Sequence, residues 1–581
     1  MHLNRREFLS VMVAASAAGI LPYRGARAAD ALYDLPSFGN VRILHFTDCH
    51  AQLLPVYFRE PDTNLGLGPA RGRPPHLVGQ AFLDHFGLSA GSAEAHALTY
   101  LDFPSLAEKY GEVGGFAHLS TLISRLREAA GADRTLLLDG GDTWQGSATA
   151  MWSQGADMVE ACNRLGVDVM TGHWEFTYGE EALRANLAQS EAEFVAQNVF
   201  LTEEALFDER PAFDEETGHA FQPYALRDVG GVQVAVIGQA FPYTPVANPR
   251  RFVPDWNYGI QEAALQTLVG EIRARHNPSL VLLLSHNGMD VDLKLASRVS
   301  GLDAIFGGHT HDGVPTAIKV KNPGGVTLVT NAGSNGKFLG VMDFQVKQGR
   351  MADARYRLLP VFSSMLPPDP EMQNWIDQAR FPHLETLNQP LAVAGQTLYR
   401  RGNFNGTFDQ VICEALLEHY DAEVALSPGF RWGTSVLPGE TLTMEHVLAQ
   451  TAITYPETYM NEMSGEQIKL ILEDVADNLF NLDPYLQQGG DMVRMAGIEY
   501  SLDPTAPIGE RLRDLRTRDG AALDPKRRYK VTGWGVVGSV APGPPVWDIV
   551  KNWLLSQKEV NLATLDQPRL LNVQNNPGIG I

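Results

Sequence analysis

Val41-Arg42-Ile43-Leu44-His45-Phe46-Thr47-Asp48-Cys49-His50 joins a mainly apolar run to a turn that carries an aspartate and a histidine two residues apart. An apolar run without strict alternation is typical of a strand buried on both faces of a layered α/β fold. In such folds functional side chains gather in the turns that follow the carboxyl ends of strands. The stretch therefore predicts a buried strand whose end carries candidate metal ligands.

Further apolar runs along the chain end in similar turns, which are dense in Gly, Asp, His or Asn. They lie at residues 135–138, 167–170, 232–237, 280–284 and 304–306. Helical segments separate these runs, and strands that alternate with helices are typical of a layered α/β sheet. We therefore expect one α/β domain over residues 38–362.

The 581 residues are too many for a single hydrophobic core, so the sequence predicts a second domain. Residues 52–110, rich in Pro, Gly and His, read as a long insertion near the site. A proline cluster and helical spacing over 371–387 indicate a linker helix within 363–388, and a smaller α/β domain is expected over 389–572. Its predicted helices are 408–419, 444–449 and 465–478, and the tail after Asn572 is expected to be frayed.

The first residues resemble a targeting segment. Asn4-Arg5-Arg6-Glu7-Phe8-Leu9 is a twin-arginine pattern, followed by a short apolar stretch and by Ala26-Arg27-Ala28, a small-x-small cleavage site. The apolar stretch is too short for a membrane span. We interpret residues 1–28 as a twin-arginine signal peptide, which predicts export to the periplasm.

Charge and cysteine content exclude several classes of function. The formal net charge of −22 opposes binding to nucleic acid and to anionic membranes. Three cysteines in a chain of this length imply no disulfide framework. An anionic substrate must therefore be attracted by local metal and arginine charge.

Five turns together carry the types of side chain that bind divalent metals. They are Asp48-Cys49-His50, Gly141-Asp142, Gly172-His173, Ser285-His286-Asn287-Gly288 and Gly307-Gly308-His309-Thr310-His311. Residues i and i+2 of an extended turn point the same way, so Asp48 with His50, and His309 with His311, can each present two groups to one pocket. Five such turns, each closing an apolar run, predict a metal centre.

The order of these turns resembles the calcineurin-like metallophosphoesterases, specifically the 5′-nucleotidase branch, over residues 38–362 and less closely over 389–570. The resemblance implies a four-layered αββα sandwich followed by a smaller α/β domain of the 5′-nucleotidase C-terminal type. Within that branch, Asp48-Cys49-His50-Ala51-Gln52, Gly141-Asp142-Thr143-Trp144-Gln145-Gly146 and Gly172-His173-Trp174-Glu175-Phe176 resemble the SoxB family, the thiosulfohydrolases of bacterial sulfur oxidation.

The resemblance also implies how the ligands divide between two metal ions. One metal would take Asp48, His50 and His311, the other His173, His286 and His309, and Asp142 would bridge both. By affinity order such nitrogen-rich shells favour zinc, whereas the resemblance implies two Mn²⁺ ions. If the metal is loaded in the cytoplasm before export, the protein could take up Mn²⁺ although it binds zinc more tightly.

Trp174 stands where the nucleotidase pattern G-N-H-E-F-D has the histidine that assists the departing alkoxide, and Thr177 replaces the supporting aspartate. An alkoxide leaving group needs a positioned acid, which contributes on the order of 10²–10⁴ in rate. A thiol, with a pKa of about 8.5, can leave as thiolate unaided. The substitution therefore predicts a sulfur leaving group, with Trp174 as an apolar wall and with no side-chain acid. Alternatively Trp174 only packs, and another histidine acts as acid: His45, His76, His85 or His96.

Arginines of the second domain are candidate anion-binding residues. Arg431 stands where nucleotidases have the arginine of N-G-G-G-I-R that meets the substrate, and a guanidinium grips two oxygens of a sulfonate as it does of a phosphate. Arg400 and Arg401 both fall near a second nucleotidase arginine; the sequence does not choose between them, and we name Arg401 as the candidate. No clean match to the aromatic nucleoside clamp is found.

These observations favour a periplasmic dimetal hydrolase that releases sulfate from a cysteine S-thiosulfonate. The resemblance implies that the substrate is carried by a SoxYZ-type protein, whose cysteine-bearing arm would enter the cleft between the domains. Two alternatives stay open: a nucleotide or sugar-phosphate phosphohydrolase, and a non-catalytic metal-binding scaffold. Neither nucleic acid nor a membrane is an expected partner.

Overall fold

The structure is a computed structural model that describes residues 32–36 and 38–580. The predicted twin-arginine signal peptide, residues 1–28, lies outside the described residues. Within the described part of the chain, no helix combines the length and the apolar character that a membrane crossing requires.

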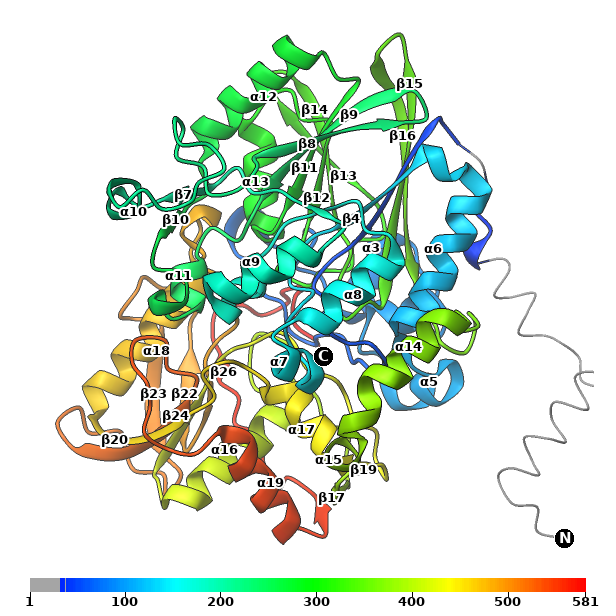
Figure 1. Ribbon diagram of the computed structural model, residues 1–581. Helices are drawn as coiled ribbons and strands as arrows, with labels where there is room; N and C mark the ends of the chain where they lie inside the picture. The colour runs from blue at the N-terminus through cyan, green and yellow to red at the C-terminus, as the bar shows by residue number, and fades with distance from the viewer. Residues whose placement is uncertain (1–31, 37, 581) are drawn as a thin grey trace, which may run out of the picture.

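Two six-stranded sheets form the centre of the first domain (Figure 1). The first has the order β16 (Arg350–Pro360), β15 (Phe338–Lys347), β1 (Val41–Phe46), β4 (Thr135–Asp139), β5 (Val169–Met170) and β6 (Glu193–Phe194). The second has the order β13 (Ile318–Asn322), β14 (Gly325–Asn331), β12 (Ala304–Gly307), β11 (Leu280–Ser285), β9 (Val232–Gln239) and β8 (Tyr224–Val229). All six predicted strands are confirmed; one matches its predicted bounds, and in the other five an end moves by one or two residues.

Successive side chains of these strands point to opposite faces of the sheet and pack in different cores. On β1, Ile43 packs between the two sheets, whereas Leu44 belongs to the core beneath the helices. Helices α6 (Phe116–Ala130) and α8 (Ala156–Leu165) cover the first sheet, and α12 (Glu262–His276) and α13 (Met289–Arg298) cover the second. The domain is therefore the expected four-layered αββα sandwich. Because the central strands are covered on both faces, most of their side chains are apolar, and the polar Arg42 and His45 of β1 are buried as well.

Shorter elements complete the first domain. They are β2 (Pro55–Val56), α3 (Gly79–Phe86), α4 (Ala93–Leu98), α5 (Phe103–Tyr110), β3 (Val113–Gly114), α7 (Ala148–Ser153), α9 (Gly179–Gln189), β7 (Val199–Leu201), α10 (Glu203–Phe207), α11 (Thr244–Ala247) and β10 (Trp256–Tyr258). Figure 1 shows α10 at the tip of an arm that projects from the sandwich beside the pair β7–β10.

The linker is not the single helix expected over 371–387. Helix α14 (Pro370–Arg380) ends before a 3₁₀ turn, Phe381–His383, and α15 (Leu384–Leu387) follows. Pro382 has no backbone N–H to donate within a continuous helix, which explains the interruption.

The second domain, yellow to red in Figure 1, is a smaller α/β unit. Its main sheet has the order β20 (Thr458–Ser464), β24 (Arg528–Trp534), β18 (Val424–Ser427) and β21 (Arg494–Ala496). Its principal helices are α16 (Thr407–Tyr420), α17 (Met444–Thr451), α18 (Gly465–Phe480) and α19 (Val546–Ser556), which confirms the three predicted helices. Two small sheets are built from β17 (Pro390–Ala394), β19 (Thr441–Thr443) and β25 (Glu559–Val560), and from β22 (Ile498–Leu502), β23 (Leu512–Thr517) and β26 (Arg569–Leu570).

The C-terminal tail is ordered, so the expectation that it frays after Asn572 is wrong. It runs back along the insertion of the first domain and exchanges hydrogen bonds with it. The bonds run from Asn64 N to Gly578 O (2.8 Å), from Val78 N to Pro577 O (3.0 Å), from Gly580 N to Asp62 O (2.6 Å) and from the Asn576 side chain to Gly66 O (2.9 Å). The insertion and the tail together therefore tie the two domains to each other.

Candidate metal centre and substrate cavity

The predicted ligands meet at one edge of the sandwich. In each sheet, parallel pairing places the relevant strand ends side by side: β1 with β4 and β4 with β5 in the first, β11 with β12 in the second. The turns after these strands carry all seven candidate ligands: Asp48, His50, Asp142, His173, His286, His309 and His311. All seven are buried.

The ligand atoms form two groups that share Asp142. Asp48, His50, Asp142 and His311 bring one ligand atom each within 4.8 Å of one another, and so do Asp142, His286 and His309. In the first group, His311 Nε2 lies 3.2 Å from Asp48 Oδ1, and His50 Nε2 lies 3.1 Å from His311 Nε2. In the second, His286 Nε2 lies 3.1 Å from Asp142 Oδ2.

His173 lies beside the second group. Its ring centroid is 5.3 Å from that of His286 and 5.2 Å from that of His309. The arrangement therefore places three imidazoles on one side of Asp142 and two imidazoles with Asp48 on the other. The grouping is compatible with the division that the resemblance implies, and the assignment of each ligand to a metal ion stays a prediction.

These residues could hold divalent cations, because several of their buried imidazole nitrogens lack a hydrogen-bond partner. His173 Nδ1, His311 Nδ1 and both ring nitrogens of His309 have no hydrogen-bond partner. Buried polar atoms are rarely left without a partner, and a role as metal ligand would account for these. Burial also raises the pKa of the Asp142 carboxyl to about 7, so its ionised form needs a nearby positive charge. A dinuclear metal site of the superfamily type is consistent with this cluster.

Two ligands have their tautomers set by backbone carbonyl oxygens. His286 Nδ1 lies 2.6 Å from Gly140 O, and His50 Nδ1 lies 3.2 Å from Gln145 O. Each Nδ1–H donates to its carbonyl, which leaves the Nε2 lone pair free toward the cluster. Partners of this kind orient metal ligands.

The pairs Asp48/His50 and His309/His311 do converge, but not through the extended turns that we expected. All four residues, and Asp142 with them, have positive φ values, between 45° and 71°. Left-handed backbone at a non-glycine residue costs about 1–2 kcal/mol. The turns keep this conformation because they are locked together: Asp48 N donates to Gly141 O (2.8 Å), and His50 N donates to Asp142 O (2.8 Å).

Glu175 braces the centre and was missed as a site residue in the sequence. Its fully buried carboxylate accepts four backbone N–H groups: those of Asp142 (3.2 Å), Thr143 (2.8 Å), Trp144 (3.2 Å) and His173 (2.7 Å). The carboxylate therefore joins the turn after β4 to the turn after β5. The available hint was a glutamate two residues from a candidate ligand, between the aromatic residues Trp174 and Phe176.

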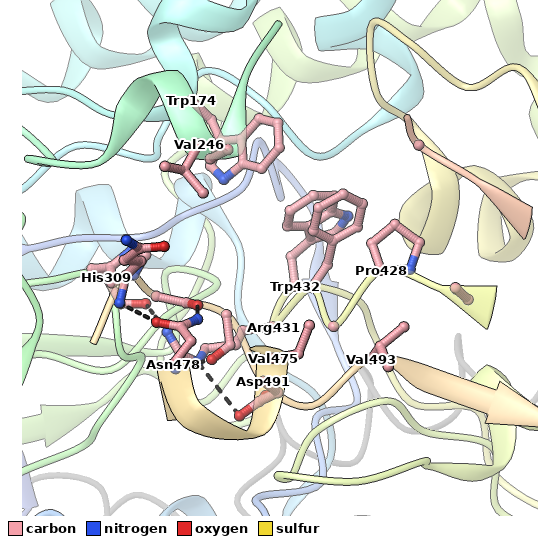
Figure 2. A pocket seen from close by; sticks show the side chains of 18 of the residues that line it. Trp174, Val246, His309, Pro428, Arg431, Trp432, Val475, Asn478, Asp491 and Val493 are labelled. Carbon is pink, nitrogen blue, oxygen red and sulfur yellow. Dashed lines mark hydrogen bonds and ion pairs between the residues drawn. The ribbon is translucent and has the colours of Figure 1, made fainter. Parts of the chain in front are cut away.

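A cavity of about 420 Å³ opens onto the cluster between the two domains. Trp174 and Val246 lie on one side of it, Val475 and Val493 on the other, and Arg431 lies near His309 (Figure 2). Its remaining lining includes five aromatic side chains, those of Phe241, Phe430, Trp432, Tyr459 and Trp534.

Trp174 forms part of the cavity wall and of the domain interface. It is 4% exposed, and its indole packs edge-on against Phe430 (5.4 Å between centroids) and Trp432 (5.0 Å) of the second domain. Its backbone N–H donates to Asp142 Oδ1 at 2.7 Å. The position at which the nucleotidase pattern has an acid therefore holds a tryptophan side chain. The backbone N–H of that residue is bound to Asp142, the candidate bridging ligand.

The histidines considered as replacement acids do not line this cavity. His45 is fully buried, and burial lowers its pKa to about 3. His96 is stacked on Phe103 and Tyr110, His85 is exposed on α3, and His76 pairs with Asp290 at 2.8 Å in a neighbouring cavity. Among the described residues, every histidine that lines the metal cavity is itself a candidate ligand.

The three candidate arginines have different surroundings. Arg431 lines the metal cavity; its Nη2 donates to Gly490 O (2.9 Å), and its Nε lies 3.7 Å from Asp491 Oδ1. Arg401 donates to Thr310 O (2.9 Å) and lines the adjoining cavity of about 250 Å³, which Arg431 also lines. Arg400 is buried in the second domain, with its Nε 2.7 Å from Asp409 Oδ1.

Comparison with known proteins agrees with this architecture. The family of the 5′-nucleotidase C-terminal domain matches residues 386–539. The solved structure of the sulfate thiohydrolase SoxB of Thermus thermophilus in complex with glycerol is 36% identical, with a TM-score of 0.86, and the alignment covers 94% of this chain and 99% of that one.

Two further proteins are similar to this chain. A 5′-nucleotidase precursor from Thermus thermophilus has the same fold, with 22% identity, a TM-score of 0.70, and coverage of 92% of this chain and 99% of that one. A trifunctional nucleotide phosphoesterase of Bacillus subtilis is 27% identical over 74% of this chain, which spans 31% of the length of that protein.

Proposed function

Because the chain belongs to the 5′-nucleotidase/calcineurin-like metallophosphoesterase superfamily of hydrolases, we propose that it is a dimetal hydrolase that releases sulfate from a cysteine S-thiosulfonate on a carrier protein. The observation that carries this proposal is Trp174, an indole in the cavity wall where an alkoxide would need its acid. The 36% identity with SoxB supports it.

The reaction balances without a side-chain acid. The oxygen of a water molecule bonds to the terminal sulfonate sulfur, and the S–S bond to that sulfur breaks. Its electron pair stays on the carrier's sulfur as an anion, sulfate leaves, and two protons pass to solvent. A sulfur anion is a weak enough base to leave unprotonated, since an ordinary thiol has a pKa of about 8.5.

The residues of the chain divide the remaining work. Bound divalent metals would lower the pKa of the attacking water and neutralise the transferring oxyanion. Arg431, which lines the cavity near His309, is positioned to hold two sulfonate oxygens with its planar fork. Trp174 and Trp432 exclude water from the opposite wall, which strengthens every charge interaction inside the cavity.

The location of the cavity supports a carried substrate. Its walls come from both domains and are mostly apolar, which suits a slim uncharged arm better than a free anion. We infer a SoxYZ-type sulfur carrier with a cysteine-bearing arm as the partner. Export to the periplasm through residues 1–28 and loading with two Mn²⁺ ions belong to the same proposal. Stoichiometric zinc in protein purified from its native host would contradict the choice of manganese.

One experiment separates this function from its alternatives. Purified metal-loaded protein is incubated with thiosulfonate-loaded carrier and, in parallel, with AMP and UDP-glucose, while sulfate and phosphate are assayed. We expect sulfate release alone. Phosphate without sulfate would establish the nucleotide or sugar-phosphate phosphohydrolase, which the nucleotidase relatives favour. If neither sulfate nor phosphate is released, the result favours the non-catalytic metal-binding scaffold.

Trp174→His tests the argument about the leaving group, with Trp174→Phe as a control that keeps an aromatic ring against Trp432. We expect Trp174→His to lose sulfate release or to gain little, because no proton is needed and the wall is damaged. Trp174→Phe should retain more activity. A large gain in Trp174→His alone would show that the leaving group does need a proton.

A further inference from the structure

A glycine of the second domain lies against a candidate metal ligand of the first. Gly489 has a φ of +87°, and a Cβ added to it would lie 2.4 Å from His309 Nε2 and 3.0 Å from Phe241 Cζ. Cβ atoms in proteins essentially never approach other atoms that closely. Only glycine therefore fits between the backbone of loop 487–491 and the imidazole.

The ring of His309 is held differently from those of His50 and His286. The latter two donate through Nδ1 to backbone carbonyl oxygens. His309 has no hydrogen-bond partner at either ring nitrogen, and its face stacks on Phe241 with 4.1 Å between centroids. Its orientation therefore depends on packing, between Phe241 on its face and Gly489 at Nε2.

The loop that carries Gly489 is itself fixed by one side chain. Asn478 Nδ2 donates to Gly489 O at 2.8 Å, and Asn478 Oδ1 accepts the N–H of Gln488. Figure 2 shows Asn478 beside His309. The Asn478 side-chain amide thus anchors the loop to α18 through two hydrogen bonds, and Gly489 of the anchored loop lies against the imidazole of His309.

We propose that Gly489 is a positioning residue of the metal centre, through which the second domain fixes the imidazole of His309 for the metal shared with His173 and His286. The inference rests on the dinuclear centre but not on the identity of the substrate. It means that His309 takes its position fully only when the second domain packs against it. Metal binding at that site then stabilises this packing of the two domains, because coupling between two equilibria is reciprocal.

The test compares two neighbouring glycines. Gly490 also has a positive φ, +77°, but an added Cβ would meet nothing closer than Gly429 O at 3.8 Å. Gly489→Ala and Gly490→Ala therefore share the backbone strain, and only Gly489→Ala displaces the imidazole. The full-length variants are stripped of metal, dialysed against Mn²⁺, and analysed for bound metal and for the melting temperature of the metal-free form.

We expect two Mn²⁺ per chain in the wild type and in Gly490→Ala. In Gly489→Ala the site that contains His309 should lose metal affinity on the order of 10–100-fold, the usual effect of removing support from a ligand. Asn478→Ala, which frees the loop without adding a methyl group, should weaken the same site, whereas Asn481→Ala nearby should not.

Equal metal binding by Gly489→Ala and Gly490→Ala would overturn the proposal. If Gly489→Ala does not fold, Asn478→Ala decides instead, and unchanged metal affinity in that variant would refute the positioning role. A wild type that takes up fewer than two metals would refute the centre itself. Failure to release sulfate, with metal binding as expected, would affect only the proposed substrate.

Discussion

Glu175→Gln is the sharpest test of how the metal turns are held. The carboxylate accepts four backbone N–H groups, two at each oxygen: Thr143 and Trp144 at Oε1, and Asp142 and His173 at Oε2. Glutamine has the same shape but only one carbonyl oxygen. Its NH₂ group must therefore face two amides that also donate.

The magnitude follows from those contacts. A hydrogen bond to a charged group contributes about 1.5–3 kcal/mol, and a buried donor without an acceptor costs about as much. Two of the four amides lose their acceptor in Glu175→Gln, so we expect a destabilisation of about 3–6 kcal/mol. At about 2 °C per kcal/mol for a domain of this size, the melting temperature should fall by roughly 6–12 °C.

The assay is thermal denaturation of the metal-free chain, followed by titration with Mn²⁺. Glu180→Gln is the control, because among the described residues Glu180 accepts no backbone N–H of the metal turns and pairs only with the partly exposed side chains of Arg184 and Arg210, and such pairs contribute about 0–1 kcal/mol. Glu175→Gln should also weaken metal binding, since the backbones of Asp142 and His173 lose their common acceptor. A fall in melting temperature no larger than that of Glu180→Gln would refute the bracing role.

The remaining predictions concern the second domain and the insertion. Arg431→Lys should raise the KM for the sulfonate substrate on the order of 10–100-fold, because lysine lacks the planar fork, whereas Arg400→Lys should lower the melting temperature and leave KM unchanged; equal KM effects in steady-state kinetics would contradict the assignment. Removal of residues 572–581 deletes the four hydrogen bonds to the insertion described above and two more that the exposed Arg71 side chain donates to Gln574 O and Asn575 O. From the first four alone stability should fall by about 2–6 kcal/mol, and limited proteolysis should cut within 62–78. An unchanged digestion pattern would argue against the role of the tail in holding the insertion. Burial lowers the pKa of His76, but Asp290, Asp312 and a hydrogen bond to Asn64 together raise it by more, so the folded pKa lies above the unfolded value of about 6.5. The stability from this pair is therefore fully present below about pH 6.5 and lost as pH rises through the raised pKa, so the difference in melting temperature between wild type and His76→Gln should shrink at alkaline pH, and a difference that widens there would refute the pairing.

The strands of the sandwich were predictable because burial on both faces leaves a continuous apolar run. Val41–Phe46 matches the predicted strand, and the other five predicted runs lie within one or two residues of their strands. The turns were predictable because ligand-type residues follow each run. The clustering of the seven candidate ligands follows from parallel strand order, which places those turns at one edge.

Other features lie beyond local sequence patterns. The left-handed backbone at Asp48 and His309 depends on contacts between turns that are far apart in sequence, and alternation rules do not include them. The ordered tail depends on an insertion some 500 positions away, as the bond between Asn576 and Gly66 shows. Gly489 resembles any loop glycine until the imidazole of the other domain is placed beside it.

The stretch from Gly172 to Thr177 combines three tasks, which explains how one substitution could redirect this scaffold. His173 faces the cluster, Glu175 ties its backbone to the turn of Asp142, and Trp174 donates its own N–H to Asp142 Oδ1. The backbone at 174 is therefore fixed by contacts that do not involve its side chain. A histidine and a tryptophan at this position would project from the same point toward the same cavity. A change of side chain there alters acid supply and wall polarity while leaving the ligands in place, so chemistry can diverge without rebuilding the metal centre.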